Sequence, residues 1–100
     1  MKAYKVMTEV INLSMVKKRD VFLWHSDEGI FNCTVSVHCD DDDKEREVFE
    51  LLRTLPEPNE IKWNSYKAKP NMDGFTCLTL RYGSYKVGEV DIQIFFDDVQ

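Results

Sequence analysis

The feature that most constrains this chain is a change in the period of its hydrophobic residues. Apolar and polar residues alternate over 30–39 and again over 89–96, which is typical of strands with one buried face. Between these segments the apolar residues recur at helical spacing, at Val48, Leu52 and Leu55. This spacing predicts an amphipathic helix over about residues 42–54. Strands on both sides of one helix favour an α+β fold.

The rest of the chain adds strands to this frame. Tyr4 to Leu13 is rich in β-branched and apolar residues and is read as a strand buried on both faces. Residues 21–25 and 30–39 are expected to form one hairpin, and residues 75–82 and 89–96 a second hairpin. Residues 61–67 are read as an edge strand. We therefore expect one domain, residues 1–100, with an antiparallel sheet of five or six strands and one amphipathic helix packed on one face.

The composition indicates the cellular compartment in which this chain functions. The sequence has 43% hydrophobic and 31% charged residues, as ordinary soluble domains do, and no apolar run approaches the ~20 residues of a membrane span. The first ten residues lack the apolar core of a secretory signal. Three cysteines do not form a disulfide framework. We expect residues 1–100 to be the whole working chain, in the cytoplasm.

Charge is distributed in blocks along the sequence. The net charge is −5, which disfavours nucleic acid and anionic membranes as partners. Residues 40–60 carry nine acidic and three basic groups, and residues 61–86 carry one acidic and five basic groups. Residues 87–100 add four acidic groups and no basic one. Such blocks predict separate acidic and basic faces.

The acidic block begins with four consecutive aspartates, Asp40 to Asp43. One or two of them would suffice to cap the following helix. The excess favours a second interpretation, in which the run docks on a basic protein surface or imitates a phosphate backbone. The acidic surface would consist of Asp40, Asp41, Asp42, Asp43, Glu45, Glu47 and Glu50. Asp97 and Asp98 extend it if the last strand ends near the start of the helix.

Metal and catalytic sites have little support in the sequence. The aspartates lack the spacing and the glycine of a calcium loop, and the cysteines lack the paired spacing of a zinc site. We interpret Cys33, Cys39 and Cys77 as core residues. A cysteine–histidine dyad would have to use His25 or His38, and no third residue is marked to orient it. We expect no enzyme, no metal and no cofactor.

A second segment mixes aromatic and basic residues. It contains Lys62, Trp63, Tyr66, Lys67 and Lys69, the residue types on which single-stranded nucleic acid stacks. In the other interpretations Trp63 anchors the core or, with Tyr66, contacts a protein partner.

These observations favour a small acidic binding protein without catalytic activity. The matching profile is that of stoichiometric inhibitors: phage anti-defence proteins of the anti-restriction or anti-CRISPR type, immunity proteins and DNA mimics. The expected partner is a nuclease or another nucleic-acid-binding protein with a basic surface. The alternative is a single-stranded nucleic-acid-binding module that uses residues 62–86. A third hypothesis is a structural or assembly protein that pairs through an exposed sheet edge, and a homodimer is one form that the chain could take.

Overall fold

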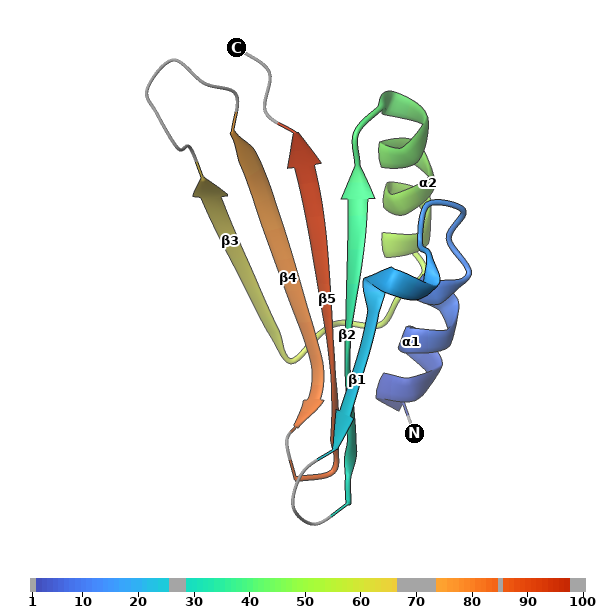
Figure 1. The fold of residues 1–100 in the computed structure, drawn as a ribbon, viewed down its shortest axis with the longest axis vertical. Coiled ribbons are helices and arrows are strands. Elements are labelled where there is room, and N and C mark those ends of the chain that lie inside the picture. Colours follow the sequence, from blue (N-terminus) through green and yellow to red (C-terminus); the bar gives the residue numbers. More distant parts are fainter. Residues whose placement is uncertain (1, 26–28, 67–73, 85, 98–100) are drawn as a thin grey trace.

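The computed structural model describes residues 2–25, 29–66, 74–84 and 86–97 (Figure 1). These residues form two α-helices, one short 3-10 helix and five strands, so the α+β class is confirmed. In chain order the elements are α1 (Lys2–Ile11), η1 (Lys18–Asp20), β1 (Val21–His25), β2 (Phe31–Cys39), α2 (Asp42–Leu52), β3 (Glu60–Tyr66), β4 (Phe75–Ser84) and β5 (Gly88–Asp97).

The strands form one mixed sheet in the order β1-β2-β5-β4-β3. Both expected hairpins are present, and β3 pairs antiparallel with β4. The expectation of a purely antiparallel sheet is wrong, because β2 and β5 run parallel, with Val35 opposite Ile92. The connection through α2 carries the chain to the far edge of the sheet. From there β3, β4 and β5 return strand by strand, and β5 arrives beside β2 in the same direction (Figure 1).

The first element differs from the sequence prediction, because the segment read as a strand is the helix α1. Its buried residues are Ala3, Val6 and Val10, three and four positions apart, which is the spacing of one helix face. Tyr4, Met7 and Ile11 flank this stripe and are partly buried. β-branched residues favour strands only weakly, and burial of a helical stripe outweighs that preference.

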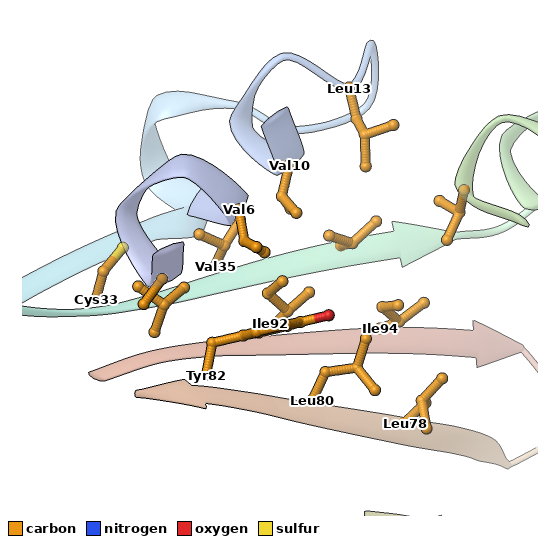
Figure 2. Close-up of a cluster of buried hydrophobic side chains, with 14 of the residues drawn as sticks. Val6, Val10, Leu13, Cys33, Val35, Leu78, Leu80, Tyr82, Ile92 and Ile94 are labelled. Atoms are coloured by element: carbon orange, nitrogen blue, oxygen red, sulfur yellow. The ribbon is translucent and has the colours of Figure 1, made fainter. Parts of the chain in front are cut away.

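The core lies between α1 and the sheet (Figure 2). Val6, Val10 and Leu13 point from the first helix and the segment after it toward β2, β5 and β4. The strand residues that meet them follow the predicted alternation and include Val35, Val37, Leu78, Leu80, Val90, Ile92 and Ile94. The helix α2 contributes Val48, which is buried.

The two faces of the sheet are covered differently. Both helices pack on one face, which we call the covered face: α1 lies over β5, β4 and β2, α2 lies beside β2, and β3 is left bare (Figure 1). No helix among the described residues packs on the opposite face, which we call the open face. The turn between β4 and β5 depends on Gly83, which has a φ of +79°. A Cβ atom at Gly83 would collide with the carbonyl oxygen of Gly88.

Candidate functional site

The acidic run has a clear role at the start of α2. Asp41 is the N-cap, and its side chain accepts a hydrogen bond of 2.8 Å from the N–H of Lys44. Lys44 also donates to Asp40 at 2.5 Å, and this hydrogen bond holds the pKa of Asp40 below its usual value. Arg46 pairs with Asp43 at 3.2 Å. One aspartate therefore caps the helix, and two cations of α2 partly neutralise its neighbours.

Three carboxylates in or beside the acidic run have no cation as a partner among the described residues. Within the described part of the chain, Asp42, Glu45 and Asp97 form no ion pair within 4.0 Å. Asp97, at the end of β5, lies with them around a hollow of about 120 Å³ next to Cys39. The expected extension of the acidic surface by the last strand is thus present at Asp97, while Asp98 lies outside the described residues. We call the surface formed by Asp40–Asp43, Glu45 and Asp97 the acidic end.

The two remaining acidic candidates lie apart from this hollow. The carboxylate of Glu47 accepts hydrogen bonds from the N–H and the O–H of Ser14, at 2.7 and 2.5 Å. These bonds tie α2 to the segment that follows α1 and hold the pKa of Glu47 below its usual value. Glu50 is exposed in the last turn of α2. The side chain of Glu47 therefore stabilises the fold, and that of Glu50 faces solvent.

A shallow apolar groove of about 230 Å³ adjoins the acidic end. Phe49 and Phe96 form one part of it, with near-parallel rings 5.8 Å apart, and Trp63 from β3 forms another. Trp63 is 61% exposed, so its interpretation as a core anchor is wrong. The reason is that neither helix covers β3. Glu45 lines both the groove and the acidic hollow, which makes them one continuous surface.

Sequence reasoning missed the contribution of Phe49 and Phe96 to this groove. Phe49 lies one position beside the stripe that contains Val48, so it projects from the rim of α2 rather than into the core. Phe96 continues the inward alternation of β5, but it lies beyond the region that α1 covers and is only partly buried. An aromatic residue one step off an apolar helical stripe was the signal available in the sequence.

The described residues of the aromatic and basic segment do not all lie on one surface. Lys62 and Tyr66 point to the open face, whereas Trp63 points to the covered face, because neighbouring residues of a strand alternate. Lys67 and Lys69 lie outside the described residues. Lys62 pairs with Glu60 at 3.2 Å. The structure thus separates the residues that the sequence had grouped.

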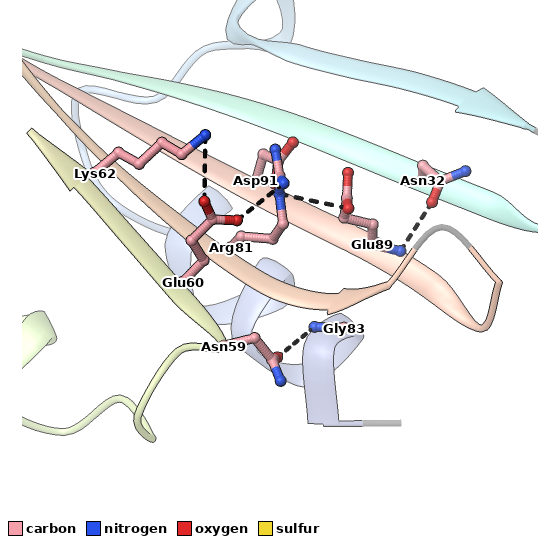
Figure 3. A network of polar contacts seen from close by, with 8 residues as sticks. All are labelled: Asn32, Asn59, Glu60, Lys62, Arg81, Gly83, Glu89 and Asp91. Carbon is pink, nitrogen blue, oxygen red and sulfur yellow. Dashed lines mark hydrogen bonds and ion pairs between the residues drawn. The ribbon is translucent and has the colours of Figure 1, made fainter. Parts of the chain in front are cut away.

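The other cation of this region, Arg81, is enclosed by carboxylates (Figure 3). It lies 3.1 Å from Glu60, 3.4 Å from Glu89 and 3.0 Å from Asp91. The hydrogen bond to Asp91 and the charge of that group raise the pKa of the guanidinium. Burial raises the pKa of Glu89, and the charge of Asp91 adds to the effect. Arg81 is therefore a cross-strand tie and not a free phosphate ligand.

A row of rings crosses the open face at the end where β2 and β5 finish. Tyr66 stacks on Phe75 at 4.8 Å, Phe75 meets Phe95 edge to face at 5.8 Å, and Phe95 stacks on His38 at 5.0 Å. Each ring belongs to a different, adjacent strand. Such cross-strand pairs stabilise a sheet. Each of the two outer rings stacks on an inner ring, so one flat side of each ring is already in contact.

The cysteines and histidines do not assemble into a reactive group. Cys33, Cys39 and Cys77 are buried, as expected. Burial, together with nearby carboxylates, raises the pKa of Cys39 to about 11, so its thiolate is scarce at neutral pH. His38 lies 3.9 Å from Asp20 and stacks on Phe95. Over the described ranges, no three His, Cys, Asp or Glu residues are placed to hold a metal ion.

Comparison with known proteins gives no relative. Neither a protein-family model, nor a curated protein, nor a solved structure matches this chain. Among the helices of the described residues, none has the length and apolar character needed to cross a membrane.

Proposed function

We propose that this chain is a non-catalytic binding protein that docks its acidic end and the adjoining groove on a basic protein surface. The supporting observation is the continuity of the two features through Glu45. Exposed aromatic residues beside a charged rim are typical of protein interfaces. The groove would receive an apolar side chain of the partner, while the carboxylates would attract and orient its cations.

The partner that this surface suits best is a protein that handles nucleic acid. Double-stranded DNA presents about one negative charge per 1.7 Å of its axis, so its binding clefts are lined with cations. Asp42, Glu45 and Asp97, which form no ion pair among the described residues, add negative charge beside the partly neutralised Asp40, Asp41 and Asp43. We therefore propose a stoichiometric inhibitor that occupies such a cleft, as anti-restriction, anti-CRISPR and immunity proteins do.

The test compares two variants with the same change in net charge. One carries Asp42→Asn with Asp97→Asn in the acidic end, and the other carries Glu9→Gln with Glu57→Gln away from it. None of these four carboxylates has an ion pair among the described residues, and the cap at Asp41 stays intact. The tagged protein is first used to isolate its partner from nuclease-treated lysate, and dissociation constants are then measured from 50 to 300 mM salt.

We expect the acidic-end variant to lose at least tenfold in affinity at 50 mM salt and to show a shallower salt dependence. The control variant should bind as the unaltered chain does. Equal losses in the two variants would mean that only net charge matters, and no loss in either would reduce the acidic run to a helix cap.

The nucleic-acid alternative has less support from the contacts. Lys62 and Arg81 are already paired with carboxylates, and Tyr82 is buried. Tyr66 already stacks on Phe75, and His38 on Phe95, so one flat side of each of these rings is occupied. Recovery of RNA or DNA that disappears with nuclease would nevertheless move the function to residues 62–86.

A further inference from the structure

Most residues of the edge strand β3 are exposed to solvent. Six of its seven residues, Ile61 to Tyr66, are exposed, and it has β4 as its only neighbour in the described sheet. Three large side chains on it face solvent: Ile61 is 54% exposed, Trp63 61% and Tyr66 47%. An apolar strand with a free edge offers its backbone N–H and C=O groups to another strand.

We propose that β3 pairs with β3 of a second copy, antiparallel about a twofold axis at Trp63. Trp63 is the midpoint of the strand, so the whole length from Glu60 to Tyr66 can pair with itself. Two five-stranded sheets would become one sheet of ten strands. The two copies would use the same surface, as a twofold interface requires.

The charges of β3 permit this register. With Trp63 opposite its copy, Lys62 faces Asn64 and Glu60 faces Tyr66, so no like charges stand directly opposite. Ile61 faces Ser65 on the covered face. The acidic end lies at the Tyr66 end of the sheet, next to Phe96 and Asp97. An antiparallel arrangement puts the two acidic ends at opposite ends of the interface, which limits repulsion between two chains of charge −5.

The two edges of the described sheet differ in length. The edge at β1 is the weaker candidate, because it has five residues and offers a shorter ladder.

The first experiment measures molar mass by light scattering after size exclusion, from 1 to 300 µM protein. We expect the mass to rise from 11.8 kDa toward about twice that value as the concentration increases. Trp63→Lys, which places a charge at the centre of the edge, should weaken association at least tenfold. The matched control is Leu23→Lys on β1, where the replaced residue is 60% exposed, and it should change nothing. Circular dichroism verifies that both variants are folded.

A second experiment tests the register. Protein with Lys62→Cys mixed with protein with Asn64→Cys should form a disulfide-linked dimer under mild oxidation. Residues directly opposite have Cα atoms about 4.5–5.5 Å apart, roughly the distance that a disulfide requires. Each variant alone should cross-link poorly, because its two cysteines would be diagonal neighbours about 7–8 Å apart. The native cysteines are buried and do not compete.

Three results would overturn the proposal: a mass of one chain at every concentration, a dimer that Trp63→Lys leaves intact, or a dimer lost in Leu23→Lys. None of them bears on the acidic end, because the Asp42→Asn and Asp97→Asn variant should associate as the unaltered chain does.

Discussion

At the scale of single residues, Glu47 shows that the carboxylates of the acidic block, residues 40–60, have different roles. Its carboxylate receives two hydrogen bonds from Ser14, one from the backbone and one from the side chain. These bonds join α2 to the segment after α1. Asp42, five residues earlier, has no comparable contact within the described ranges. A carboxylate therefore serves the fold at one position and remains available to a partner at another.

The contribution of Glu47 should depend on pH. Its pKa is lower in the folded chain than in the unfolded chain, so the stabilisation is present above the unfolded value of about 4.3 and is lost as pH falls through the folded value. We expect Glu47→Gln to lower the free energy of unfolding by about 1 kcal/mol at pH 7. The difference from the unaltered chain should shrink below about pH 4. Urea unfolding at pH 7 and pH 3 measures it, with Glu50→Gln as the control.

At the scale of elements, α2 carries its charges unevenly. Asp42, Asp43 and Glu45 lie in its first turn, where carboxylates meet the positive end of the helix dipole. Its last turn has no basic residue and contains the exposed Glu50, where a negative charge is unfavourable. The position of Glu50 is thus not explained by helix stability.

Replacing this residue separates stability from binding. Glu50→Lys should raise the free energy of unfolding by about 0.5 kcal/mol, because it puts a cation at the negative end of the helix. If Glu50 belongs to the docking surface, the same change should weaken the complex with the captured partner. Thermal melting and a binding titration on one preparation give both values. A variant that melts lower would contradict the dipole argument, and unchanged affinity would remove Glu50 from the surface.

Gly83 adopts a positive φ beside the turn between β4 and β5. Gly83 and Gly29 have nearly the same positive φ, +79° and +77°, but a Cβ atom would collide with Gly88 at the first and meet nothing within 4 Å at the second. We expect Gly83→Ala to cost about 3 kcal/mol and Gly29→Ala about 1 kcal/mol, since only the first adds a collision to the backbone strain. Chemical denaturation of the two variants measures both losses of stability. Equal losses would contradict the expectation that Gly83→Ala costs more than Gly29→Ala.

At the scale of the whole molecule, sequence patterns predicted local structure better than arrangement. The alternation around Val35 and Ile92 located β2 and β5, and Asp41 to Leu52 followed helical rules. The residues of α1 were read as a strand because β-branched residues outweighed a helical stripe. The pairing of β2 with β5 was missed because register between distant strands depends on packing that no local pattern records.

The candidate surface was predictable only in part for the same reason. The four consecutive aspartates can be identified directly in the sequence. Asp97 was expected beside them if the last strand ended near the start of the helix, and it lies there. The groove of Phe49, Phe96 and Trp63 draws on three separate elements. Its exposure depends on which strands the helices leave bare, and this follows from the strand order.

The position of β5 has a consequence for biosynthesis. It is the last strand in the described chain and lies at the centre of the sheet, where it joins β1 and β2 on one side to β3 and β4 on the other. The hydrogen bond between Asn32 and Glu89 connects residues 57 positions apart. Strand pairing between β1–β2 and β3–β4 therefore runs through β5, so the sheet is completed only after the last of the described strands has left the ribosome.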